Sequence, residues 1–444
     1  MMPLTRFSRL AATALGFLPL AAAPGTAQIP LDGIGVGAFR SGTIPGGLAV
    51  LDPAVTTTTL VTGLCLEANS IAIDPYDRTK LLVGGIDPSG SACPSSGTIF
   101  EVTLSGTTGT GSIVISTLPS QASVSDLLFD DDGNLFASSG VGVYKVDRAT
   151  GAAVLLAAGF GVGAVANALA YDPVGNDLYV GAVGPGLVFH VDPETGTSTP
   201  LHSASVAGIT GNSTISGLTL SEDRAKVYAS TFGPGLPGGP SGPTWIVELP
   251  TNPALWPAPP LPLDVTPPIG SLTPPNDIEI HGPKMFTASA TNTDTIYEID
   301  LSVGPPHPAV AVPYFPGGIG ASFGVPSQLA VNEFEDDLTV FPRRPASGTT
   351  ATFRLALGGP PGDFGVIGVF GFDPDGPGPA PLVVDPFILG AGIFVGVEGN
   401  LALPPFDVII GGGTTGTLVT LAAARLSATG LVNLDLSAAT VEIQ

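Results

Sequence analysis

The residues with the clearest chemical potential form two adjacent columns within a phrase that the chain contains six times. The first column is polar in every copy and reads Asn69, Ser125, Asn167, Ser216, Asn276 and Ser327. The next column reads Ser70, Asp126, Ala168, Gly217, Asp277 and Gln328. Carboxylate and amide oxygens are the ligands that calcium prefers, and they also suit a small polar ligand. The same Asn and Ser residues could instead satisfy backbone groups where each strand begins, and the sequence leaves both interpretations open.

Each copy of the phrase reads as a short strand, and the copies recur at long, similar intervals. Their starts are 56, 42, 49, 60 and 51 residues apart, and self-similarity at such a period indicates a propeller or a solenoid. Between the copies, runs of β-branched and aromatic residues alternate with Asp-Gly, Gly-Asn and Thr-Gly turns. This pattern favours four strands per repeat. The predicted fold class is therefore all-β.

The first and last repeats are incomplete in complementary ways. The N-terminal runs GIGVGAFRSG, GGLAVLDP and TTTTLVTG match strands two to four of a blade. The last copy, SQLAVNE at residues 327–333, supplies only a first strand. Joining them completes a sixth blade and closes the ring, which leaves only short protected edges. We therefore predict a six-bladed β-propeller over residues 28–336. An open β-solenoid or two stacked sandwiches would not explain the missing first strand.

In this architecture, inner strands three blades apart lie opposite each other. Asp126 and Asp277 are therefore predicted to face each other across the mouth of the central channel. The longest loops fall on the same face, at residues 85–97, 202–216, 232–245 and 250–275, and long loops on a rigid scaffold concentrate function. The predicted ligand site is this channel mouth, with Asn69, Asp126, Asn167, Ser216, Asn276, Asp277 and Gln328.

The Pro-rich stretch 250–275 supports two interpretations. It favours polyproline II conformation and could act as a rigid spacer. Alternatively, Trp256 within it could anchor a protein partner.

The N-terminus reads as a secretory signal peptide over residues 1–27. Arg6 and Arg9 precede an apolar run, and small residues before Gln28 offer a cleavage site. The run is too short to span a membrane comfortably. No later stretch reaches the length of a transmembrane helix without Gly or Pro. The formal charge of −23 repels nucleic acid and anionic membranes. A secreted, periplasmic or cell-surface location follows.

The chain has two cysteines, Cys65 and Cys93. In an exported chain, two cysteines most simply form one disulfide. Both are predicted to fall in loops of the first complete blade. A bridge would close a loop of about 29 residues and stabilise the fold by roughly 3 kcal/mol.

The pattern changes after Glu333. Residues 337–444 read as short alternating strands separated by Pro and Gly, which predicts a small β-sandwich domain. Such a module could anchor the protein at the cell surface, take part in sorting, or cap the propeller. Its residues do not distinguish these uses.

From about residue 34 to 333, the repeated phrases resemble six-bladed propellers of the NHL-repeat and gluconolactonase-like kind. Gluconolactonase-like hydrolases hold a divalent metal with one Glu, two Asn and one Asp. Carried over by position, this resemblance implies Glu67, Asn167 and Asp277 as metal ligands and calcium as the candidate cofactor. The chain departs from the pattern at Ser216, where those enzymes have Asn, and its Pro275-Asn276-Asp277 element is one residue out of step.

The sequence favours an exported, non-catalytic binding scaffold that uses the channel mouth for a small polar ligand or a protein partner. Two alternatives stay open, a calcium-dependent lactonase or esterase and a purely structural surface protein. No histidine falls in the ring columns, so the sequence identifies no general base.

Overall fold

The computed structural model describes the chain in part. The described residues of the repeat region are 33–39, 47–52, 57–61, 67–74, 80–86, 97–105, 108–119, 123–130, 133–161, 165–172, 175–183, 186–201, 214–221, 223–232, 246–257, 261–266, 275–289, 296–312 and 325–330. The eight strands that follow are described between residues 338 and 443. Strands β1–β25 belong to one compact unit and strands β26–β33 to another. The boundaries predicted after residues 27 and 336 stay predictions.

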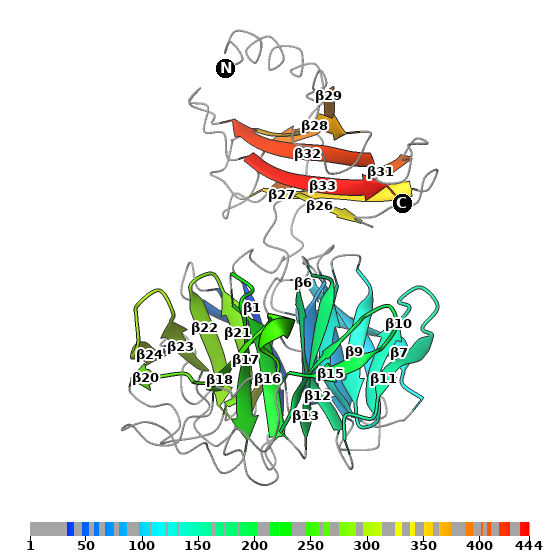
Figure 1. Ribbon diagram of the computed structural model, residues 1–444. Helices are drawn as coiled ribbons and strands as arrows, with labels where there is room; N and C mark the ends of the chain where they lie inside the picture. The colour runs from blue at the N-terminus through cyan, green and yellow to red at the C-terminus, as the bar shows by residue number, and fades with distance from the viewer. Residues whose placement is uncertain are drawn as a thin grey trace. The chain divides into compact units, whose positions relative to one another are not determined.

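The first unit is a six-bladed β-propeller, in which every blade contains four antiparallel strands (Figure 1). Blade 1 contains β25 (Val325–Ala330), β1 (Ile34–Phe39), β2 (Gly47–Asp52) and β3 (Thr57–Val61). Blade 2 contains β4 (Glu67–Ile73), β5 (Lys80–Ile86), β6 (Thr98–Ser105) and β7 (Thr108–Thr117). Blade 3 contains β8 (Val124–Phe129), β9 (Leu135–Ser139), β10 (Gly142–Val146) and β11 (Ala153–Ala158).

The other three blades follow the same order from the channel outward. Blade 4 contains β12 (Val165–Asp172), β13 (Asp177–Val183), β14 (Val188–Val191) and β15 (Ser198–Pro200). Blade 5 contains β16 (Thr214–Leu220), β17 (Lys226–Phe232), β18 (Ile246–Pro250) and β19 (Leu261–Pro262). Blade 6 contains β21 (Pro275–His281), β22 (Lys284–Ser289), β23 (Ile296–Asp300) and β24 (His307–Ala311). A short fifth strand, β20 (Val265–Thr266), pairs in parallel with β24.

Blade 1 closes the ring in the predicted way. The late strand β25 pairs antiparallel with β1, with Leu329 opposite Val36 and Ala330 opposite Gly35. The first strand of each blade contacts the first strand of the next blade, and β25 contacts β4 to complete the circle. The composite blade therefore confirms the prediction drawn from the two incomplete repeats.

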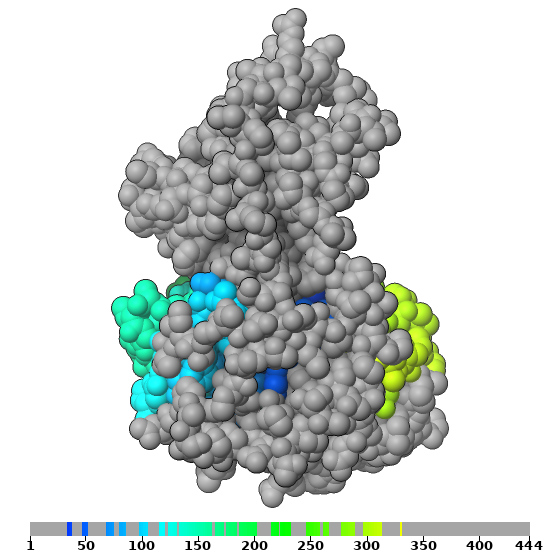
Figure 2. All heavy atoms as spheres, turned by 180° about the vertical axis from the view of Figure 1, so that it is seen from behind, coloured from blue at the N-terminus to red at the C-terminus, as the bar shows by residue number. Residues whose placement is uncertain are grey.

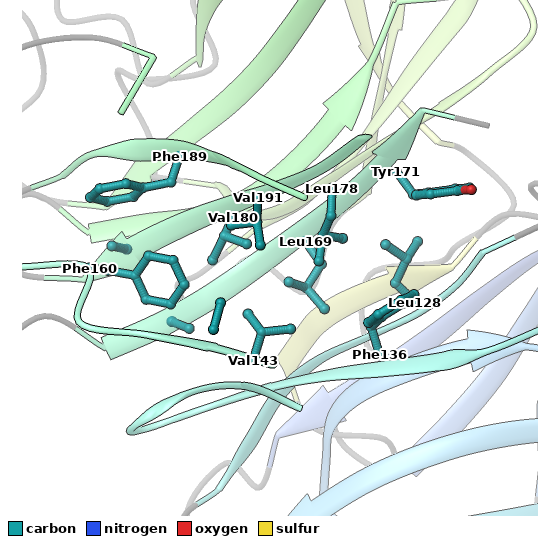
Figure 3. Close-up of a cluster of buried hydrophobic side chains, with 13 residues drawn as sticks. Leu128, Phe136, Val143, Phe160, Leu169, Tyr171, Leu178, Val180, Phe189 and Val191 are labelled. Atoms are coloured by element: carbon teal, nitrogen blue, oxygen red, sulfur yellow. The ribbon is translucent and has the colours of Figure 1, made fainter. Parts of the chain in front are cut away.

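The hydrophobic core lies between the blades. Along β13, Leu178 and Val180 pack toward blade 3, whereas Tyr179 between them packs toward blade 5. Successive side chains of a strand point to opposite faces, so each blade is buried on both faces by its neighbours. Figure 3 shows one such layer, in which Phe136 and Val143 of blade 3 meet residues of blade 4. Within this layer, the rings of Phe160 and Phe189 pack edge to face, with 5.1 Å between their centroids.

All six inner strands carry a β-bulge at the same point, and the bulged residue is the polar first column. In β12, for example, Ala166 pairs with Ala182 and Ala168 with Gly181, so Asn167 is left without a partner in the ladder. The same shift skips Asn69, Ser125, Ser216, Asn276 and Ser327. A bulge bends a strand and re-aims its side chains. The repeated Asn or Ser therefore marks a conformational feature of the ring.

Gly217 follows the bulge of blade 5 and lies directly against blade 6. A Cβ atom at this position would lie 2.7 Å from both Asp277 Cα and the Ile278 amide nitrogen, which are backbone atoms that cannot move aside easily. We expect Gly217→Ala to lower the free energy of unfolding by about 1–3 kcal/mol through overpacking. Chemical denaturation of the full chain measures the change.

Gly304 provides the matched control for this substitution, because a Cβ there would meet nothing within 4 Å. Gly304→Ala should change the free energy of unfolding by less than about 0.5 kcal/mol. Equal losses in the two variants would contradict the close approach of blades 5 and 6 at Gly217.

The second unit contains two antiparallel sheets. One has the order β26 (Leu338–Phe341), β27 (Thr350–Leu357) and β30 (Leu401–Ala402), and β31 (Phe406–Ile409) also pairs with β27. The other has the order β29 (Phe387–Ile393), β28 (Phe364–Asp373), β32 (Thr417–Leu426) and β33 (Leu436–Ile443). This pairing establishes an all-β unit, and the face-to-face packing of a β-sandwich stays a prediction.

The Pro-rich stretch 250–275 was predicted to be one long loop, and this is wrong. It contains a 3₁₀ turn at Pro253–Leu255, the outer strand β19 of blade 5 and the added strand β20 of blade 6. Buried Leu263 and Val265 pack with Ile278 and Met285 of blade 6. The segment therefore carries the chain from the outer edge of blade 5 to that of blade 6.

Candidate functional site

Asp126 joins the inner strands of blades 3 and 4. It follows the bulge in β8, and its Oδ1 accepts a hydrogen bond from the Leu127 amide at 2.8 Å. Its Oδ2 accepts one from the Leu169 amide at 2.7 Å, on β12 of the next blade. An inner strand has no ladder partner on its channel side, so the amides on that side need other acceptors. One carboxyl group supplies two of them.

Asp277 makes the same arrangement three blades away. Its Oδ1 accepts a hydrogen bond from the Ile278 amide at 2.9 Å, and its Oδ2 accepts one from the Leu329 amide at 2.8 Å. Leu329 lies on β25, the strand that closes the ring. In a view from behind, described residues of blades 2 and 3, cyan to teal, lie on the opposite side of the propeller from those of blade 6, yellow-green (Figure 2).

The two carboxyl groups influence each other. Burial raises the pKa of Asp126 to about 7, although its two amide hydrogen bonds act in the opposite direction. Burial also raises the pKa of Asp277 well above its usual range, and the negative charge of Asp126 raises it further. Like charges that share a poorly solvated space disfavour double ionisation. The two residues lie three blades apart, as predicted, and the facing of their side chains across the channel stays a prediction.

Several polar residues of the first column form ties within or between blades. The Asn69 side-chain amide donates to Ser123 Oγ of blade 3 at 2.7 Å. The Asn167 side-chain amide donates to the Ile215 carbonyl of blade 5 at 2.8 Å. Ser216 Oγ lies 3.0 Å from Ser230 Oγ on the neighbouring strand of its own blade. Only the Asn167 contact matches the second interpretation of the column, in which Asn and Ser satisfy backbone groups at the start of each strand; the other two contacts join side chains.

Two side-chain oxygen atoms of blade 2 form no such hydrogen bonds. Asn69 Oδ1 and Ser70 Oγ are buried and have no hydrogen-bond partner among the described residues. Asn69 is 5% exposed and Ser70 is fully buried. Ser70 holds the register position in β4 that Asp126 holds in β8, immediately after the bulge. Buried polar atoms without a protein partner indicate a place for water or for a ligand.

Several predicted site residues can be placed only by their backbone. Asn276 is the bulged residue of β21, Gln328 pairs with Gly37, and Glu67 pairs with Ile86. Their side chains lie outside the description. Cys65, Cys93 and most of the predicted loops 85–97, 202–216 and 232–245 also lie outside the described residues. The disulfide and the loop surface therefore stay predictions.

The calcium site implied by the resemblance fits the described side chains poorly. Both oxygens of Asp277 already accept backbone amides, and Asn167 donates its amide to a carbonyl. Calcium takes six to eight oxygen ligands, but the positions after the bulge in blades 4 and 5 are Ala168 and Gly217. No group of three or more His, Cys, Asp or Glu that could hold a metal occurs within the described ranges.

An ion network between blades 2 and 3 was not predicted from the sequence. Arg148, in the turn after β10, lies 2.5 Å from buried Asp74 and 3.6 Å from Glu101, both of blade 2. Lys80 lies 2.9 Å from Glu101. The Arg148 guanidinium also stacks 5.2 Å from the Phe129 ring. The turn after β10 resembles the corresponding turns of other blades, so its sequence does not single out Arg148. The one available signal is that basic residues are scarce in this acidic chain.

Thr219 forms a further tie that the sequence did not indicate. It lies two residues after Gly217 in β16, and its Oγ1 accepts a hydrogen bond from the Ile280 amide at 3.2 Å. The same hydroxyl donates to Glu279 Oε2 at 3.3 Å. Both partners belong to β21, so Thr219 joins blades 5 and 6 as Asp126 joins blades 3 and 4.

The Trp256 side chain contacts other residues of the propeller. Its indole nitrogen donates to the Pro250 carbonyl at 2.8 Å. Its ring lies 5.5 Å from that of His190 in blade 4, and it packs partly buried against the core between blades 4 and 5. This position assigns Trp256 a structural contact and leaves the predicted anchoring of a partner untested.

Over the described part of the chain, no helix has the length and hydrophobicity needed to cross a membrane.

Comparison with known proteins gives similarity of fold only. No protein-family model matches this chain, and no curated protein matches it. Among solved structures, a nidogen/laminin complex aligns at 14% identity with a TM-score of 0.47, covering 67% of this chain and 97% of that one. A calcium-binding protein, regucalcin, from Agrobacterium tumefaciens aligns at 17% identity with a TM-score of 0.37, covering 54% and 72%. A xyloglucanase from Xanthomonas campestris aligns at 11% identity with a TM-score of 0.41, covering 74% and 59%.

Proposed function

We propose that this protein is an exported, non-catalytic binding scaffold that receives a small polar ligand at the mouth of its channel. The N-terminal sequence supports export. The rigid ring of inner strands supports a preformed site, because its members are held by hydrogen bonds between blades. Surface attachment through residues 337–444 is a separate prediction from the sequence.

The observation that carries the proposal is a set of acceptor atoms in the ring. Asn69 Oδ1 and Ser70 Oγ are buried without a partner in the described structure. Asp126, on the inner strand of the neighbouring blade, and Asp277 carry raised pKa values, mainly because burial disfavours their charged forms. A ligand that donated hydrogen bonds to these groups would offset the free energy that their burial costs. Binding sites typically combine an otherwise satisfied scaffold with a few convergent polar groups.

A thermal melting screen of the full chain tests the proposal. The panel contains neutral sugars, organic acids, amines, and calcium with a chelator as its reference. A ligand at about 100 times its dissociation constant stabilises the folded state by about 2.7 kcal/mol. This corresponds to a rise in Tm of about 5 °C for a domain of this size. We expect at least one compound to give such a rise.

Ser70→Ala tests whether that compound binds at the ring. The Ser70 hydroxyl has no partner in the described structure, so its removal should leave the ligand-free Tm unchanged or slightly raised, whereas the ligand-induced rise should shrink. Thr287→Val is the matched control, because Thr287 Oγ1 is also buried without a partner but lies on β22, outside the inner ring. A panel without any stabilising compound, or one whose effects survive Ser70→Ala, would refute the proposal.

A further inference from the structure

We infer that the ligand of the channel mouth is an organic cation, and that its ammonium group sits between Asp126 and Asp277. This inference rests on the proposed function and adds the chemical class of the ligand. Asp126 and Asp277 lie on inner strands three blades apart, and the charge of Asp126 acts on Asp277, so one positively charged group between them would interact with both.

The charge of the site favours a cation. Ionised carboxylates can only accept hydrogen bonds, and the unpartnered Asn69 Oδ1 is also an acceptor. Glu279, two residues after Asp277 on β21, is a further acid, and the Thr219 hydroxyl donates to it. None of these ring groups supplies a positive charge. Opposite charges within about 4–6 Å stabilise the ionised form of a carboxyl group, so a cation relieves the repulsion between Asp126 and Asp277.

The hydrogen-bond geometry favours an ammonium group over a metal ion. Each carboxyl oxygen of Asp126 and Asp277 is already oriented by one backbone amide. Each of these oriented carboxyl oxygens retains a lone pair for one further donor. An ammonium group has three N–H donors, which match one oxygen from each Asp and the unpartnered oxygen of Asn69. The ring positions at Ala168 and Gly217 supply no side-chain oxygen, and calcium would need such ligands.

Isothermal titration calorimetry of the full chain at pH 8 tests the inference, since Asp126 is then mainly ionised. The probes are n-butylammonium chloride, 1,4-diaminobutane dihydrochloride, calcium chloride, and n-butanol as the neutral counterpart of butylamine. We expect the two amines to bind and n-butanol not to bind. Asp126→Asn and Asp277→Asn should each weaken amine binding about tenfold, as expected for the loss of one charge-assisted hydrogen bond.

Asn69→Asp provides a variant with the opposite expected effect. It adds a third carboxylate to the ring, and the Ser123 hydroxyl can donate to it in place of the lost Asn69 contact. Amine affinity should therefore increase several-fold. Glu298→Gln is the control, because Glu298 pairs with Lys284 on strands β23 and β22, outside the inner ring. It should bind amines as the unmodified protein does.

Three outcomes would overturn the inference. Equal binding of n-butanol and n-butylammonium would remove the role of charge. Unchanged amine binding in both Asp→Asn variants together with Asn69→Asp would place the amine elsewhere. Binding of calcium or a neutral sugar that Ser70→Ala weakens, without amine binding, would contradict the ammonium ligand and leave the proposed function standing.

Discussion

Replacing Arg148 by alanine is expected to lower the free energy of unfolding by about 3–5 kcal/mol, the range for breaking a buried ion pair. The Asp74 side chain is only 3% exposed, and the Arg148 guanidinium contacts both Asp74 and Glu101. Without it, two poorly solvated acids of blade 2 lose a shared cation in a chain with 37 acidic and 14 basic residues. Loss of packing on Phe129 adds to the effect. Urea denaturation at pH 7 measures it.

The double variant Arg148→Ala with Asp74→Asn separates charge from packing. Because a neutral Asn needs no cation, the double variant should lose less than the sum of the two single losses. Lys226→Ala is the comparison for an ordinary surface pair, since Lys226 is 46% exposed and contacts Glu248 at 2.6 Å; its loss should stay below about 1 kcal/mol. A loss in Arg148→Ala no larger than that in Lys226→Ala would show that the network contributes little.

The second large effect is a loss of stability as the pH rises from about 4 to 7. The folded-state pKa of Asp126 is about 7 and its ordinary value is 3.8, so the folded protein holds this proton more tightly than the unfolded chain does. The contribution to stability is complete below the unfolded pKa and is lost as the pH rises through the folded one. Each pKa unit corresponds to about 1.4 kcal/mol, so the pair of buried carboxyl groups accounts for a few kcal/mol. The raised pKa of Asp277 acts in the same direction.

Denaturation curves collected across this pH range test the effect. Asp126→Asn should flatten the dependence, and it should also lower the pKa of Asp277 by removing the neighbouring charge. Absolute stability is a poorer measure, because Asn cannot accept from both Leu127 and Leu169. Asp300→Asn serves as the control, since hydrogen bonds from Ser302 lower the pKa of Asp300. Its small contribution should instead be lost as the pH falls, and an unchanged slope in Asp126→Asn would contradict the assignment.

The blade count and ring closure could be predicted because they depend on local patterns. Each inner strand repeats its own alternation, and the incomplete first and last repeats can complete a blade only if β25 pairs with β1. The placement of Asp126 and Asp277 three blades apart followed from counting blades. Predicting these features does not depend on the distance between adjacent blades.

The roles of the ring residues could not be predicted for a physical reason. Asn167 donates to a carbonyl 48 residues away, and Asp126 accepts from an amide 43 residues away. Such partners are set by the spacing between blades and by the bulge, which the sequence does not reveal. Asn and Ser read alike whether they bind a ligand or tie two strands. The ion pairs of Arg148 could not be predicted because its acidic partners lie in the preceding repeat.

The pairing of β25 with β1 has a consequence for biosynthesis. Blade 1 cannot form until residue 330 has left the ribosome, because β3 ends at residue 61 and the innermost strand, β25, begins only at residue 325. Until then, β1 lacks its inner partner and the Leu329 amide is not available to Asp277. Contacts of such long sequence separation form slowly. The chain is therefore expected to stay open during most of its synthesis, a state that would suit the export predicted from the N-terminal sequence.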